Sequence, residues 1–199
     1  YSVDEGGNIK FESAAPGPDV LHTKKNWDNG VKDKGQTVND KSLLPQLAKE
    51  RSDFTMKDFR GDVHKGSYGV TTNTQDAAKV FEFVSKNSDV EWTLEMYKGG
   101  KNFLGTNHSS DGVKSGFSVN GLGLNVLNLR IDIHSHPGIS PKDDVASTFN
   151  GGDVGRAGNI TEQFLKAGYG YDKLPKFQVY RPHVAKPHYI TYDAWTPRL

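Results

Sequence analysis

Hydrophobic and polar residues alternate along two segments of the chain, and each alternation predicts a strand with one buried face. In residues 128–134 the alternating residues are Leu129, Arg130, Ile131, Asp132, Ile133 and His134. In residues 90–97 the apolar face carries Val90, Trp92, Leu94 and Met96, and the other face carries Glu91, Thr93 and Glu95. These two strands are the strongest predictions of extended structure in the chain.

Helical spacing occurs in three other segments. Residues 76–86 place apolar side chains at the spacing of an amphipathic helix, and a second helix is predicted from Asp153, as N-cap, to Gly168. A shorter helix is expected over 42–51. Further strands are predicted at 102–106 and 112–119, and two closing strands between 177 and 192. Helices and strands combined in this order predict an α+β or α/β fold, a mixed sheet flanked by helices.

The first 60 residues differ from the rest. They are polar and interrupted by glycine and proline, so residues 1–60 are interpreted as a polar leader or arm packed on a domain that spans 61–199. The chain begins at Tyr1 without a methionine, and we expect it to be part of a longer protein.

Charge and composition limit the function classes. The 25 Lys and Arg nearly balance the 24 Asp and Glu, which argues against nucleic acid or a membrane surface as a partner. No apolar run is long enough to span a membrane. The chain has no cysteine, which excludes disulfides, thiolate metal ligands and a cysteine nucleophile.

The candidate chemistry lies at the end of the strand 128–134. His134 and His136 are two residues apart, so they are expected to point to the same side, and Pro137 ends the strand. Two imidazoles and a carboxylate form a common transition-metal site, and a hydrolytic zinc site also needs a base near its water. Asp143, Asp144 and Asp153 are the possible carboxylate ligands.

Glu91 is the candidate base. It lies on the strand face opposite the apolar residues, which could place it across the sheet from the two histidines.

These features resemble the JAMM/MPN+ metalloproteases, or JAB domains, which have a mixed sheet of the cytidine-deaminase-like kind. The family has a Glu on a strand after the first helix, then HxHP at a later strand end, then a Ser and an Asp near the next helix. Here Glu91 follows helix 76–86, and His134-Ser135-His136-Pro137 begins 43 residues later. With its Gly-Gly-Asp before a helix and its polar leader, the chain looks most like the JAB-like toxin domains at the carboxyl ends of bacterial Rhs-type polymorphic toxins.

The chain departs from the family pattern at the third ligand. The family spacing would place a serine at position 144 and an aspartate at position 147, but these positions hold Asp144 and Ser147. Asp153 is favoured as the ligand because the family ligand lies at a helix start. Ser147 and Ser140 are both candidates for the serine that stabilises the oxyanion.

The resemblance implies a function. His134, His136 and Asp153 would bind Zn²⁺, and Glu91 would activate water for attack on a peptide or isopeptide carbonyl. The domain would be delivered into a target cell as part of a larger bacterial protein, and an immunity protein would protect the producer. Two other hypotheses are a catalytically inactive MPN-type protein-binding module and a metal-dependent nuclease toxin.

Overall fold

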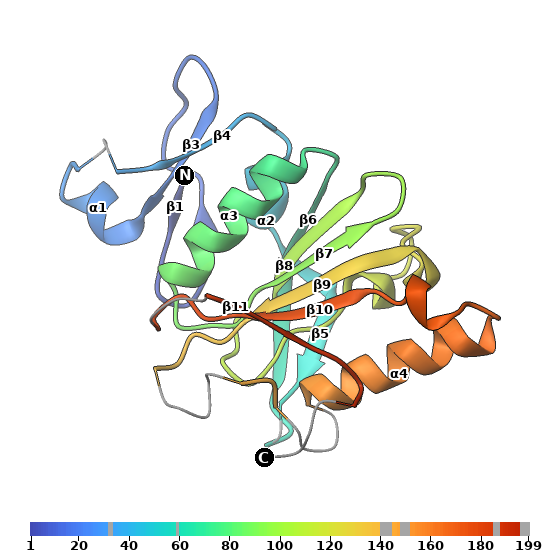
Figure 1. Ribbon diagram of the computed structural model, residues 1–199. Coiled ribbons are helices and arrows are strands. Elements are labelled where there is room, and N and C mark those ends of the chain that lie inside the picture. The colour runs from blue at the N-terminus through green and yellow to red at the C-terminus, as the bar shows by residue number, and fades with distance from the viewer. Residues whose placement is uncertain (32–33, 59, 140–144, 148–151, 185–187, 196–199) are drawn as a thin grey trace.

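The computed structural model describes residues 1–31, 34–58, 60–139, 145–147, 152–184 and 188–195. Its main element is a seven-stranded mixed sheet with strand order β11-β10-β9-β7-β8-β6-β5 (Figure 1). The strands are β5 (Glu50–Lys57), β6 (Val63–Thr71), β7 (Thr93–Tyr97), β8 (Asn102–Thr106), β9 (Leu129–Ser135), β10 (Lys176–Tyr180) and β11 (Tyr189–Tyr192). Only β9 and β10 pair in parallel, and the other neighbours are antiparallel. This architecture is consistent with a JAB/MPN-like fold, as expected.

Two long helices cover opposite faces of this sheet (Figure 1). Helix α3 (Thr74–Lys86) packs Val80, Phe81 and Val84 against the face that carries Leu94 and Ile133. Helix α4 (Asp153–Lys166) packs on the other face, and its residues Ala157, Ile160 and Phe164 belong to a second core with Phe103, Leu129 and Phe177. Both strand faces are therefore buried, including the polar face of β7.

Residues 1–38 form a smaller, four-stranded sheet of order β2-β1-β3-β4. Its elements are β1 (Ser2–Val3), β2 (Ile9–Lys10), β3 (Asp19–Thr23), α1 (Lys24–Asp28) and β4 (Gln36–Val38). Val3, Leu21 and Val38 are buried in the same core as α3 and the short helix α2 (Leu43–Leu47). This polar segment therefore packs on the rest of the chain. β5 also lies within residues 1–60 and pairs with β6 of the main sheet.

One predicted strand is wrong. Residues 112–119 contain the 3₁₀ turn Gly116–Ser118 and no strand. Gly112 has a φ of +150°, and a Cβ at Gly116 would approach the Phe103 ring to 2.4 Å. The glycines therefore allow a close-packed turn, and the alternation of residue types around them does not indicate a strand.

Two further 3₁₀ turns span Val126–Asn128 and Tyr171–Lys173.

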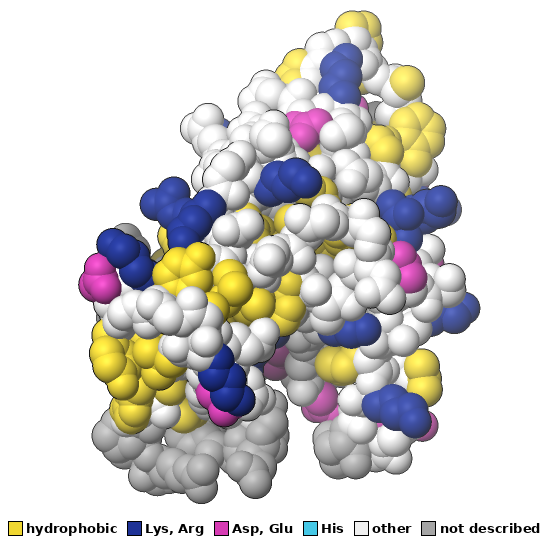
Figure 2. All heavy atoms as spheres, turned by 90° about the vertical axis from the view of Figure 1, so that its right-hand side faces the viewer, with side chains coloured by type: hydrophobic (Ala, Val, Ile, Leu, Met, Phe, Trp, Pro, Cys, Tyr) yellow, Lys and Arg dark blue, Asp and Glu magenta, His cyan; other side chains and the backbone are white. Residues whose placement is uncertain are grey.

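On the face seen in Figure 2, lysine and arginine side chains are scattered singly among neutral ones. The helices of the described ranges include none with the length and apolar character needed to cross a membrane.

Candidate metal centre

The two histidines emerge side by side where β9 ends. β9 pairs with β7 on one side and β10 on the other, and the His136 amide donates to Tyr180 O at 2.9 Å just beyond the strand. This pairing keeps the chain extended through His136, so His134 and His136 point to the same side of the sheet. Their ring centroids are 5.1 Å apart, and both side chains are buried.

Asp153, the first residue of α4, faces both imidazoles. Its Oδ1 lies 2.8 Å from His134 Nε2, and its Oδ2 lies 3.3 Å from His136 Nε2. The N-cap of α4 is Gly152 rather than Asp153, which corrects the predicted cap. Because the carboxylate is not used to cap the helix, it can turn towards the sheet.

Ser147 holds Asp153 in this position. The Ser147 amide donates to Asp153 Oδ2 at 2.7 Å, and the Asp153 amide donates to Ser147 Oγ at 2.8 Å. Ser147 therefore braces the carboxylate, and its oxyanion role stays a prediction. Ser140, Asp143 and Asp144, the other candidates from the sequence, lie outside the described residues.

The three side chains fit a transition metal. Their ligand atoms all lie within 4.8 Å of one another, as in a JAMM His-His-Asp group. Nδ1 of His134 has no hydrogen-bond partner in the described part of the chain, and its Nε2 lies 2.8 Å from Asp153 Oδ1. Burial alone would raise the pKa of Asp153, but the two imidazoles hold it well below its usual range. An ionised carboxylate and a neutral imidazole are the forms that bind metal.

Glu91 lies at the same end of the sheet. Ser135 donates its amide to Trp92 O at 2.8 Å, and the Trp92 amide donates to Ser135 Oγ at 2.9 Å. The β7–β9 register, carried two residues beyond Thr93 and His134, places Glu91 opposite His136. Burial raises the pKa of Glu91 to about 7, even though His134 and His136 act in the opposite direction. A carboxyl group with this pKa suits general base and acid catalysis near neutral pH.

A buried ionic network, which the sequence analysis did not find, lies next to the three metal-site residues. Arg156 donates from Nε and Nη2 to the two Asp132 carboxylate oxygens, both at 2.8 Å. Its Nη2 also donates to Glu95 Oε1 at 2.9 Å, and Glu95 Oε2 accepts from Tyr97 Oη and from the Gly116 amide. Asp132 and Glu95 are completely buried. The network ties the first turn of α4, and with it Asp153, to β7 and β9.

Residue spacings in the sequence indicate part of this ionic network. Asp132 precedes His134 by two residues, and Glu95 follows Glu91 by four, so each strand carries an acidic residue on the same face as its site residue. Arg156 follows Asp153 by three residues, which places the two on one side of α4.

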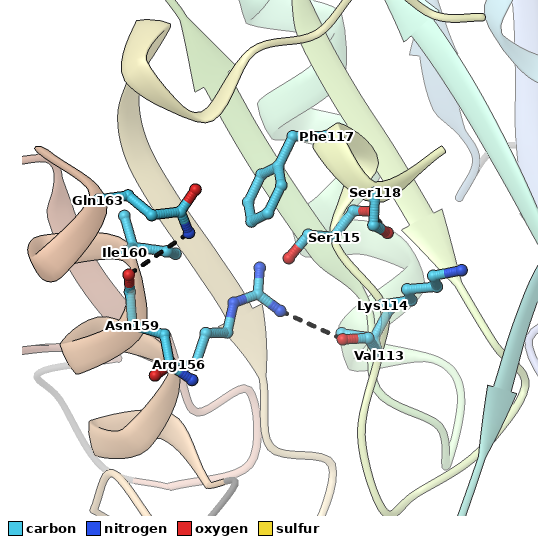
Figure 3. A pocket seen from close by; sticks show the side chains of 9 residues that line it. All are labelled: Val113, Lys114, Ser115, Phe117, Ser118, Arg156, Asn159, Ile160 and Gln163. Atoms are coloured by element: carbon cyan, nitrogen blue, oxygen red, sulfur yellow. Dashed lines mark hydrogen bonds between the residues drawn. The ribbon is translucent and has the colours of Figure 1, made fainter. Parts of the chain in front are cut away.

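A hollow of about 340 Å³ opens between α4 and the loop 113–118 (Figure 3). Val113, Ser115 and Phe117 line one side, and Asn159 and Gln163 of α4 line the other. Arg156 reaches across it and donates from Nη1 to Val113 O at 3.2 Å. The same arginine therefore fixes the loop, the helix and both strands.

The fold and the cluster define a class of protein: a mixed α/β domain with a His-His-Asp group that could hold a metal. Residues 69–158 match the family described as JAB-like toxin 1, so this part of the chain is similar to a JAB-like toxin domain. The match includes Glu91, His134, His136, Asp153 and Arg156. No curated protein and no solved structure matches the chain.

Proposed function

We propose that the domain is a zinc-dependent peptidase or isopeptidase of the JAMM type. The observation that carries the proposal is the buried cluster at the end of β9. There an ionised Asp153 faces two imidazoles, and Nδ1 of His134 has no hydrogen-bond partner in the described ranges. Two nitrogens and one oxygen form a typical ligand set for catalytic zinc, which keeps a further position open.

Each site residue has a separate role in the proposed hydrolysis. Zinc, when bound, supplies a Lewis acid for the carbonyl and lowers the pKa of water. Glu91 accepts a proton from the attacking water as the C–O bond forms. It then delivers that proton to the amine as the C–N bond breaks. Its pKa of about 7 suits both transfers. Ser147 and Arg156 act on Asp153, through hydrogen bonds and by fixing α4.

The biological setting of the proposal follows from the toxin family. The domain would be the toxin module of a larger bacterial protein of the Rhs type, delivered into a target cell. Its substrate would be a peptide or isopeptide bond, and a cognate immunity protein would bind it in the producing cell. We propose no nucleic-acid or membrane partner, because the charges of the chain are balanced.

Metal analysis of the purified protein tests this function. We expect about one zinc per chain, lost when His134 and His136 are both replaced by alanine, because two of the three ligands disappear. Asp153→Ala should weaken zinc binding strongly. His64→Ala is the matched control, since His64 contacts Asp58 in a separate ion pair at 3.1 Å and is not among the three proposed ligands.

Two results of this metal analysis would contradict the proposal. If the wild-type protein bound no zinc after incubation with it, the catalytic proposal would fail. The result would then favour the hypothesis of a catalytically inactive binding module. If Asp153→Ala kept full zinc affinity, the carboxylate ligand would have to be another residue.

A further inference from the structure

Tyr192 of β11 lies on the same sheet face as the metal-site histidines. β11 pairs Tyr192 with Phe177 of β10, and β10 pairs Phe177 with Asp132 of β9, so the three residues form one row across the sheet. The Tyr192 ring lies against Phe177, with centroids 5.8 Å apart. It also meets the His134 ring edge-on, at 6.1 Å and 79°. The last described strand thus brings an aromatic side chain to the metal centre.

The hydroxyl of Tyr192 is buried and has no partner among the described residues. The side chain is 4% exposed, and its Oη has no hydrogen-bond partner in the described ranges. A buried hydroxyl without a partner is unfavourable, and a group missing from the structure is the usual explanation. The neighbouring carboxylates already have partners: Asp132 accepts two bonds from Arg156, and Asp153 faces the imidazoles and accepts from Ser147.

The hydroxyl is a proton donor at neutral pH. An ordinary tyrosine hydroxyl, with a pKa of about 10, is protonated at this pH. The buried Tyr192 ring lies edge-on against the buried His134 ring, so the tyrosine belongs to the same buried region as the metal-site residues. A ligand oxygen that reaches His134 would therefore come near the Tyr192 side chain.

We propose that Tyr192 is a catalytic residue: its hydroxyl donates a hydrogen bond to the substrate carbonyl oxygen as that oxygen gains negative charge. The proton stays on the tyrosine, and no covalent bond to it forms or breaks. The inference rests on the proposed peptidase function. It adds a donor from β11, outside the family match of residues 69–158, at a site where the expected serine spacing is absent.

Tyr192→Phe tests the proposal because it removes only the hydroxyl. The protein is loaded with Co²⁺, and the visible spectrum follows the binding first of the metal and then of acetohydroxamate, an oxygen-donor probe. We expect Tyr192→Phe to keep the Co²⁺ affinity but to bind the probe about tenfold more weakly, as expected for one lost hydrogen bond to a charged oxygen. The melting temperature of the metal-free variant should not fall, because the lost hydroxyl has no hydrogen-bond partner in the part of the chain that the structure describes.

Tyr189→Phe is the matched control on the same strand. The Tyr189 hydroxyl donates to Glu82 at 2.6 Å, on the side of the sheet covered by α3. This variant should lose some stability and bind the probe as the wild type does. Comparison of the two variants thus distinguishes the loss of a structural hydrogen bond from the loss of a contact with the ligand.

Three outcomes would overturn the inference. Equal probe affinity in Tyr192→Phe and wild type would remove the hydroxyl from the site. A lower melting temperature in the metal-free variant, with unchanged probe binding, would assign a structural role. If the wild type bound no Co²⁺, the proposed function itself would fail and this inference with it, whereas the first two outcomes leave the proposed function intact.

Discussion

Glu91→Gln is expected to lower the rate of peptide hydrolysis by about 10²–10⁴-fold while the protein keeps its zinc. Glutamine has nearly the same shape as glutamate, but it cannot accept a proton from water or carry one to the leaving amine. Glu91 is not among the three residues that face one another as metal ligands, so metal binding should persist. The measurement compares initial rates on a panel of peptide and isopeptide substrates, with zinc content determined on the same samples.

A surface glutamate provides the control for this experiment. Glu162 pairs with Lys166 on the exposed side of α4, and Glu162→Gln should leave the rate unchanged. Full activity in Glu91→Gln would remove Glu91 from the mechanism. Loss of zinc in that variant would instead indicate that Glu91 supports the ligands.

Arg156→Met is expected to have the largest effect on stability, about 3–5 kcal/mol. Arg156 is the ion-pair partner of both Asp132 and Glu95, and both carboxylates are completely buried. Methionine fills similar space but leaves the two acids without a countercharge in a region of low dielectric constant. Urea unfolding of the metal-free proteins measures the difference in the free energy of unfolding.

The Arg156→Met loss should be larger at pH 8 than at pH 5. Burial, then the charge of Asp132, raises the pKa of Glu95 to about 7 even with Arg156 present. In the unfolded chain a glutamate has a pKa of about 4.3. The folded state therefore binds the extra proton, and the cost of ionising Glu95 reduces stability as the pH rises through this window. Without Arg156 that cost increases, whereas acid conditions relieve it by protonation.

Arg130→Met is the control for this prediction, because Arg130 lies on β9 with its side chain exposed. It should change stability by no more than about 0.5 kcal/mol. An equally small loss in Arg156→Met would show that the acids are protonated or hydrated without the arginine.

The strands and helices that border the metal centre were predictable because each has a strong local pattern. Residues 128–134 and 90–97 alternate, 76–86 has helical spacing, and the structure contains β9, β7 and α3 at these places. The small sheet of residues 1–38 was not predicted. Its strands have two to five residues, too few for a period to emerge, and their pairing across the chain supplies the order.

The sequence by itself determined that His134 and His136 lie side by side, because two residues on one strand must point the same way. It also placed Asp153 at a helix start and Glu91 on the polar face of its strand. Only the tertiary structure decided what those positions face. The polar face of β7 is covered by α4, which makes Glu95 and Asp132 partners of Arg156 and turns Asp153 towards the histidines.

The position of Tyr192 beside the metal site was likewise decided by the tertiary structure alone. In the sequence it is one aromatic residue of a closing strand, 56 positions after His136. The order of β9, β10 and β11 in the sheet brings its ring to His134 and leaves its hydroxyl buried, with no hydrogen-bond partner among the described residues. Residue spacing reports neighbours within one strand or helix, whereas contacts between strands depend on the topology of the whole sheet.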